Sequence, residues 1–146
     1  MNTTHWGGGI VYHKTMPEIL LVEETDEDGK SFWGYPGGIK KSEEDDYDTF
    51  ARELGEEAHR QIIEKAKVEL ITGRKELKRN EWFTLFRTSV TNTRIIMPEF
   101  ADPEITGRGF FGKEEIRHLI KKGKFKKKFI NVHQELEDII FPKVLV

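Results

Sequence analysis

The segment from Asp45 to Arg60 constrains the fold more than any other, because it combines a helical apolar repeat with a dense group of acids. At about 100° per residue, an apolar arc of the helix lies beside an arc of glutamates. The apolar arc consists of Phe50, Ala51, Leu54 and Ala58, and the acidic arc of Glu53, Glu56 and Glu57. The segment therefore predicts a helix that packs on a sheet and presents a face of carboxylates.

Helix stability alone does not favour acids at these positions. Like charges three or four residues apart repel each other by roughly 0.2–0.5 kcal/mol per pair. Glu56 and Glu57 also lie toward the C-terminal end, where the helix dipole opposes an exposed negative charge by about 0.3–1 kcal/mol. A solvated acidic face and a cation site both remain open on these grounds. If an ion binds, carboxylate oxygens favour Mg²⁺ or Mn²⁺.

The rest of the chain alternates short apolar runs with turn residues. Strands are expected at residues 9–12, 18–23, 67–72, 81–90 and 94–97, with another closed by Phe110 and Phe111. Helices are expected at residues 42–58, 113–122 and 130–140, and an aromatic, glycine-rich loop at 32–38. Ser42 is expected to cap the first helix and Gly123 to end the second. This order predicts an α/β fold in which helices pack on a mixed sheet, in a single domain over residues 1–146.

Composition excludes several classes of protein. The chain has 146 residues and no cysteine, so a disulfide framework and a thiolate site are ruled out. Its first residues lack the basic start and apolar run of a signal peptide. No apolar stretch reaches the roughly 20 residues that span a bilayer. We therefore expect a cytoplasmic protein with no membrane partner.

The formal net charge of −2 hides a segregation of charge along the chain. Eight of the 26 acids lie within residues 43–57, and eight of the 24 bases lie within residues 113–128. The second group includes a basic segment, residues 121–128, that could attract phosphate or RNA. A solvated face is the alternative interpretation of that segment.

A run of three glycines, Gly7, Gly8 and Gly9, precedes the first apolar run. It lacks the Gly-Lys-Ser/Thr ending of a phosphate-binding loop. The run therefore indicates the start of a strand where neighbouring backbones approach closely.

The spacing around the acidic helix resembles the Nudix box, Gly-x5-Glu-x7-Arg-Glu-U-x-Glu-Glu-x-Gly-U, where U is a bulky apolar residue. The matching residues are Gly38, Glu44, Arg52, Glu53, Leu54, Glu56 and Glu57. The chain departs from the pattern at the end of the box, where His59 replaces glycine and Arg60 replaces the apolar residue. His59 could still end the helix, or the helix could continue. Arg60 could pair with Glu56 or touch a substrate phosphate.

The flanking segments also resemble a Nudix (MutT-like) hydrolase, over nearly the whole chain. The similar segments are the strands at 7–11 and 19–22, the lead-in at 33–38, and the late strand and helix from 104 onward. The resemblance implies an α/β/α sandwich with a mixed sheet. It also implies a Mg²⁺-dependent enzyme, with Mn²⁺ possible, that cleaves the phosphoanhydride of a nucleoside diphosphate linked to another moiety.

The resemblance assigns roles to individual residues. The implied metal ligands are the carbonyl of Gly38 and the carboxylates of Glu44, Glu53, Glu56 and Glu57. Arg52 would brace these carboxylates. Glu53 is the first choice for the base that activates water, and Glu104 is the preferred alternative from a later loop, ahead of Glu99 and Asp102. Phosphoryl-group transfer needs positioning and charge neutralisation, which these residue types supply.

The substrate class stays open at this level. A nucleoside triphosphate, ADP-ribose and a dinucleoside polyphosphate are all compatible, because residues 64–80 carry no subclass signature. Trp33, Tyr35 and Phe111 could stack on a base or pack in the core. Two other functions are a Nudix-fold sensor that binds a nucleotide without cleaving it, and an RNA 5′-pyrophosphatase or decapping enzyme suggested by the basic segment. The family also makes a homodimer possible.

Overall fold

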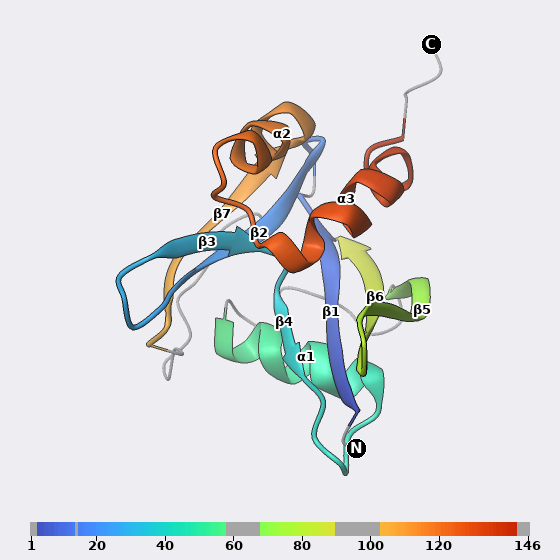
Figure 1. Cartoon of the computed structure of the whole chain (residues 1–146). Coiled ribbons are helices and arrows are strands. Elements are labelled where there is room, and N and C mark those ends of the chain that lie inside the picture. Colours follow the sequence, from blue (N-terminus) through green and yellow to red (C-terminus); the bar gives the residue numbers. More distant parts are fainter. Residues whose placement is uncertain (1–2, 14, 58–67, 90–102, 143–146) are drawn as a thin grey trace.

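The computed structural model of the chain describes residues 3–13, 15–57, 68–89 and 103–142 (Figure 1). The strands are β1 (Thr4–Tyr12), β2 (Glu18–Thr25), β3 (Ser31–Gly34), β4 (Gly37–Ile39), β5 (Glu69–Lys78), β6 (Glu81–Ser89) and β7 (Ile105–Gly112). The helices are α1 (Asp46–Glu57), α2 (Lys113–Lys121) and α3 (Lys127–Ile140). The strand expected at 94–97 lies outside the described residues.

All these strands belong to one sheet with the order β3-β2-β1-β6-β5, while β4 pairs with β1 and β7 pairs with β2. The pairing of β1 with β6 is parallel along its whole length, from Thr4 opposite Glu81 to Tyr12 opposite Ser89. The other pairs are antiparallel. The predicted mixed sheet is therefore confirmed. β1 and β2 pair at one end, where Tyr12 lies opposite Ile19. Beyond this point, β1 pairs with β4, and β2 lies between β3 and β7.

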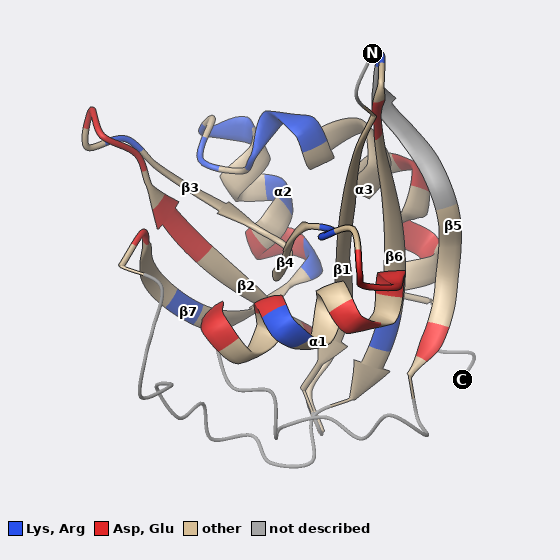
Figure 2. Ribbon diagram, turned by 90° about the horizontal axis from the view of Figure 1, so that it is seen from below, with Lys and Arg blue, Asp and Glu red and all other residues tan. Residues whose placement is uncertain are grey.

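The helices cover both faces of the sheet, which makes an α/β/α sandwich. Because successive strand residues point to opposite faces, Ile10 packs toward Phe129 of α3, whereas its neighbour Val11 packs toward Phe50 and Leu54 of α1. Figure 2 looks onto α1, with α2 and α3 behind the sheet. None of the described helices is both long enough and apolar enough to cross a membrane.

Helix α1 begins at Asp46, later than the sequence predicted, because Asp45 and not Ser42 caps it. The amide of Asp48 donates to Oδ1 of Asp45 at 2.7 Å, and the amide of Asp45 donates to Oδ2 of Asp48 at 3.3 Å. This reciprocal pair satisfies amides that the first helical turn leaves unbonded.

The segment 32–38 was predicted to be a loop, and that prediction was wrong. Its first part belongs to β3, where Trp33 pairs with Glu23, and its last part belongs to β4. Four other elements extend beyond their expected bounds, since β1 begins at Thr4, β2 ends at Thr25, β5 ends at Lys78 and α3 begins at Lys127. Gly34, Gly37 and Gly38 lie inside the sheet, where neighbouring atoms occupy the space that a larger side chain would need.

Gly8 and Gly37 show this close packing most clearly. The two residues face each other across β1 and β4. A Cβ on Gly8 would overlap the Trp6 ring and the carbonyl of Pro36. Gly37 also has a φ of 157°, a conformation that L side chains rarely adopt, and a Cβ there would overlap the Trp6 ring. The glycine run therefore marks a close approach of backbones, as predicted, but it lies inside β1, which begins at Thr4, and not at the start of the strand.

A buried polar pair joins the connection between β3 and β4 to α3. The Tyr35 hydroxyl lies 2.5 Å from Nδ1 of His133, and both side chains are buried among Phe125 and Phe129. Burial lowers the pKa of His133 to about 4. The imidazole is therefore neutral at physiological pH, and Tyr35 is fixed in the core.

We predict that Gly8→Ala destabilises the protein by about 1–3 kcal/mol, the usual cost of forcing extra atoms into a packed site. The expected cause is the overlap with Trp6 and Pro36. Gly73→Ala is the control, because the nearest atom to its Cβ would be Leu70 Cδ2 at 3.8 Å. Urea unfolding of both variants measures the difference, and equal stabilities would contradict the close-approach interpretation.

We predict that the protein loses stability as the pH falls below 7. The unfolded pKa of histidine is about 6.5, whereas burial lowers the pKa of His133 to about 4. Between these values the unfolded chain binds more protons, so the free energy of unfolding falls as the pH is lowered, by up to about 3 kcal/mol from this group. Urea unfolding at pH 7.0 and 4.5 should show a shallower dependence for His133→Gln than for the wild type. His118→Gln, at an exposed position, should keep the wild-type dependence.

Candidate active site

Helix α1 is fixed against the glycine-rich part of the sheet. Its residues Thr49, Phe50 and Leu54 are buried, and a Cβ on Gly7 would lie 3.1 Å from the Thr49 side chain. At the start of the helix, the Thr84 hydroxyl of β6 donates to Oδ2 of Asp46 at 2.9 Å. These contacts determine which side of α1 is left for the acids.

The glycine that opens the sequence motif lies directly against Glu53, the first glutamate of the helix. A Cβ on Gly38 would overlap the carboxylate of Glu53. Gly38 is held in β4 opposite Gly7. The backbone of β4 thus forms one wall of the carboxylate site, and a side chain at this position would displace Glu53.

Arg52 is the centre of the carboxylate group. Its Nε donates to Oε2 of Glu44 at 2.8 Å, and its Nη1 donates to Oε1 of Glu53 at 2.7 Å. Nη1 also lies 3.4 Å from Oε1 of Glu56, and Nη2 donates to the carbonyl of Ile39 at 2.9 Å. A planar guanidinium can hold several acceptors in one geometry. These are the contacts that a bracing residue would make.

Glu44 is ionised and held from two sides. Its carboxylate accepts from Arg52 and from the amide of Lys41, the latter at 2.9 Å. These hydrogen bonds, that of Arg52 first, lower the pKa of Glu44 to about 2. The residue lies before the helix and connects the loop after β4 to Arg52.

Glu57 is the most buried of the four glutamates, with 4% of its surface exposed. Its Oε1 accepts a hydrogen bond from the amide of Gly37 at 2.7 Å. Burial raises the pKa of Glu57 well above its ordinary value, the Gly37 hydrogen bond lowers it, and the nearby charge of Glu53 raises it. A nearby positive charge would stabilise the ionised form of a carboxylate in this position.

The C-terminal end of α1 has no basic residue of its own in its last turn. Arg108 of β7 supplies one, because its Nε donates to the carbonyl of Glu57. A cation at this end of a helix is favoured by the helix dipole and satisfies a terminal carbonyl. Sequence analysis missed Arg108, which is 51 residues away and carries no local signal.

The carboxylates do not form a finished metal site. In the part of the chain that the structure describes, no three acidic or imidazole side chains converge in the manner of metal ligands. Arg52 lies between Glu44, Glu53 and Glu56, while Glu57 lies beside Gly37. The donor set is nevertheless all oxygen, with a backbone wall that a Cβ would fill, and this chemistry fits Mg²⁺.

The other predicted residues lie in different places. Glu104 lies in the turn before β7, and its carbonyl accepts from the amide of Thr25 at 2.9 Å. The rings of Trp33 and Phe111 are half-buried and lie 4.7 Å apart, whereas Tyr35 is in the core with 1% of its surface exposed. The remaining predicted positions, His59, Arg60, Glu99 and Asp102, lie outside the described residues.

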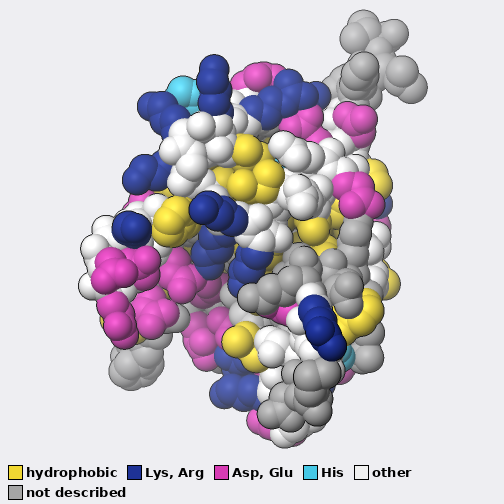
Figure 3. Space-filling view, in the orientation of Figure 1, with side chains coloured by type: hydrophobic (Ala, Val, Ile, Leu, Met, Phe, Trp, Pro, Cys, Tyr) yellow, Lys and Arg dark blue, Asp and Glu magenta, His cyan; other side chains and the backbone are white. Residues whose placement is uncertain are grey.

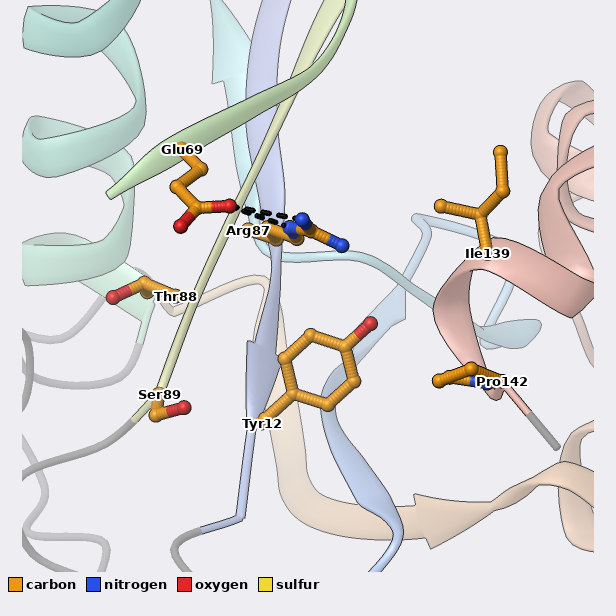
Figure 4. Close-up of a pocket in the computed structure, with 7 residues that line it drawn as sticks. All are labelled: Tyr12, Glu69, Arg87, Thr88, Ser89, Ile139 and Pro142. Atoms are coloured by element: carbon orange, nitrogen blue, oxygen red, sulfur yellow. Dashed lines mark hydrogen bonds and ion pairs between the residues drawn. The ribbon is translucent and has the colours of Figure 1, made fainter. Parts of the chain in front are cut away.

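A pocket of about 340 Å³ is present elsewhere, on the face of the sheet that carries α3 (Figure 4). Tyr12 and Ile139 line it, and Arg87 lies at its edge, bonded to Glu69 at 2.9 Å. The Tyr12 hydroxyl donates to the carbonyl of Ile140 at 2.6 Å, which ties the strand to α3. Because α1 lies on the opposite face, this pocket is separate from the carboxylate site.

Comparisons with known proteins bear on the family to which the chain belongs. The NUDIX domain matches residues 5–132. No curated protein sequence matches the chain significantly. Among solved structures, a NUDIX hydrolase from Nitrosomonas europaea superposes with a TM-score of 0.70 at 20% identity, over 94% of this chain and 88% of that one.

Two further solved structures share the fold. One comes from an analysis of MutT from Aliivibrio salmonicida and Vibrio cholerae, with a TM-score of 0.62 at 17% identity over 97% of this chain and 98% of that one. The other is the E. coli ORF135 protein, with a TM-score of 0.63 at 16% identity over 95% and 94%. At these identities the structural likeness establishes the fold, while the domain match covers most of the chain. The chain therefore belongs to the Nudix family of pyrophosphohydrolases.

Proposed function

We propose that the protein is a Mg²⁺-dependent hydrolase that cleaves the phosphoanhydride of a small nucleotide, with Mn²⁺ as a possible substitute. The substrate is a nucleoside triphosphate, ADP-ribose or a dinucleoside polyphosphate. The observation that carries this proposal is the arrangement of Glu44, Glu53 and Glu56 around Arg52, with Glu57 buried beside Gly37. The enzyme is proposed to act in the cytoplasm, and a homodimer is compatible with the family.

The proposed ligands of the ion are oxygens from α1 and the segments before it. They are the carbonyl of Gly38 and the carboxylates of Glu44, Glu53, Glu56 and Glu57. When bound, Mg²⁺ neutralises the phosphoanhydride oxygens and lowers the pKa of a coordinated water. The ion would also compensate the repulsion between Glu53 and Glu57, which share the site with no basic residue in the last helical turn.

The protein's own side chains position the reaction. Glu53 accepts a proton from the attacking water, and Arg52 supports this role because its hydrogen bond of 2.7 Å restricts how the carboxylate turns. Glu104 is the second candidate for the base. Trp33 and Phe111 offer a half-buried aromatic surface on which a base can stack. Tyr35 lies in the core against Phe125, Phe129 and His133, so it does not offer a surface for stacking.

Two other functions remain as alternatives. A Nudix-fold sensor would bind a nucleotide without cleaving it, and the presence of all four box glutamates favours the enzyme. An RNA 5′-pyrophosphatase is favoured by the basic segment, whose lysines 121, 122, 124, 127 and 128 are exposed. In Figure 3 the basic side chains gather over α2 and the segment that follows it, next to an acidic patch over the β2–β3 hairpin.

We predict that purified protein with Mg²⁺ hydrolyses at least one of the three nucleotide classes, and that Glu57→Gln lowers kcat by about a hundredfold or more. The reason is the loss of a carboxylate that would hold the ion. Glu69→Gln is the matched control, because that glutamate pairs with Arg87 away from α1. A phosphate-release screen that includes a 5′-triphosphorylated RNA measures turnover. Activity retained by Glu57→Gln would contradict the site, and nucleotide binding without turnover would favour the sensor.

We also predict that Arg52→Lys weakens Mn²⁺ binding by about tenfold or more, as is usual when a group that orients metal ligands is lost. Lysine keeps the charge but cannot hold Glu44, Glu53 and the carbonyl of Ile39 together. Titration calorimetry with Mn²⁺ measures the change. Arg87→Lys, in an arginine–glutamate pair away from α1, should bind Mn²⁺ like the wild type. An unchanged affinity in Arg52→Lys would exclude the bracing role.

A further inference from the structure

One lysine of the basic segment points inward while its neighbours face solvent. Lys126 is half-buried, whereas Lys124 and Lys127 are exposed. The difference comes from the backbone, because the amide of Trp33 donates to the carbonyl of Lys124 at 2.8 Å and the amide of Lys126 donates to the carbonyl of Trp33 at 2.8 Å. Residues 124–126 thus pair with β3 and are held in register there.

The stem of Lys126 is packed as well as its backbone. A Cβ on Gly34 would lie 2.9 Å from Cδ of Lys126, so the glycine leaves room for the methylene chain. With the backbone and the stem both held, the ammonium group has few positions available. Such an ordered cation loses little conformational entropy when it binds a ligand.

The ammonium group pairs with Glu24 of β2, within electrostatic range of the carboxylate site. Nζ of Lys126 lies 2.5 Å from Oε2 of Glu24, with 20% and 37% of the two side chains exposed. Both charges act on the buried carboxylate of Glu57: Lys126 lowers its pKa and Glu24 raises it. β7 runs beside Glu24, and its Arg108 reaches the end of α1. Lys126 is therefore close enough to the end of α1 to act on it electrostatically.

Glu24 is an exchangeable partner for this lysine. The pair is partly exposed, so solvent weakens the attraction between Lys126 and Glu24. A phosphate group offers more acceptor oxygens and more negative charge than a single carboxylate, and it accepts charge-assisted hydrogen bonds from an ammonium group. In the free protein Glu24 compensates the charge of Lys126, and an anionic ligand can replace it.

We propose that Lys126 is a substrate-binding residue that exchanges Glu24 for a phosphate group of the substrate's phosphoanhydride chain. This inference rests on the proposed function, since it takes the phosphate chain to lie against α1. It divides the basic segment into one lysine that binds the ligand and exposed lysines that face solvent. Glu24 acts as a competitor that the substrate displaces.

The test measures binding of methylenediphosphonate, a diphosphate mimic that cannot be hydrolysed, in the presence of Mg²⁺. By calorimetry, Lys126→Gln should weaken binding by about tenfold or more, the effect of losing one charge-assisted hydrogen bond. Lys126→Arg should restore most of the affinity. Lys127→Gln removes the same charge from the exposed neighbour and should change the affinity by less than about twofold.

Glu24→Gln separates ligand binding from a structural role. If Glu24 competes with the ligand, this variant binds the diphosphonate as tightly as the wild type or more tightly. If the ion pair is only structural, Glu24→Gln and Lys126→Gln lower the melting temperature equally and weaken binding equally, which would overturn the inference. Equal losses in Lys126→Gln and Lys127→Gln would also overturn it, because they indicate general attraction. Failure of the wild type to bind the diphosphonate would overturn it too.

Turnover decides the proposed function separately. If the wild type hydrolyses a nucleotide and Lys126→Gln has an unchanged KM, the inference fails and the hydrolase assignment stands. If the wild type binds the diphosphonate through Lys126 but turns over no nucleotide, the binding residue stands and the hydrolase assignment fails. A raised KM with a smaller change in kcat is the result expected if both are right.

Discussion

The close approach of β1 and β4 through glycine is the contact on which the rest of the site depends. Gly7 faces Gly38 and Gly8 faces Gly37, and there is no space for side chains between these strands, the Trp6 ring and α1. Because the strands lie so close, the backbone of β4 reaches the acids of the helix. The carboxylate site is therefore built against main-chain atoms, whose positions vary less than those of side chains.

Charge balance in the site comes from several distant parts of the chain. Arg52, a residue of α1, pairs with the carboxylates of Glu44, Glu53 and Glu56. Arg108 of β7 donates to the carbonyl of Glu57 at the end of α1. Lys126 acts from the start of α3, where it balances Glu24. Since Arg52 and Lys126 pair with carboxylates and Arg108 pairs with the carbonyl of Glu57, the protein's own cations balance the acidic cluster.

The sequence predicted the elements whose signal is local and missed those whose signal is not. The helical period predicted α1 and its acidic face, and the order of short apolar runs and helical segments predicted the mixed sheet. Ser42 and Asp45 are both good capping residues, and the choice depends on Asp48, three residues after Asp45. Glycine favours loops, so segment 32–38 was predicted to be one. The groups that crowd its glycines come from distant parts of the chain: Trp6 of β1 at Gly37, Glu53 of α1 at Gly38, and Lys126 and Phe129 at Gly34. Arg108 and Lys126 could not be assigned, because their partners lie 51 and 102 residues away.

The connection between β3 and β4 has a consequence for how the chain folds. Trp33 pairs with the segment around Phe125, and Tyr35 bonds to His133, 98 residues further on. β1, in turn, needs β6 as its parallel neighbour. Closing such long loops is entropically costly and slow. During synthesis, Trp33 and Tyr35 therefore lack their final neighbours until α3 has been made. The carboxylate site, which this segment leads into, is then completed late. A nascent chain that already contains all the acids of α1 still has no finished site.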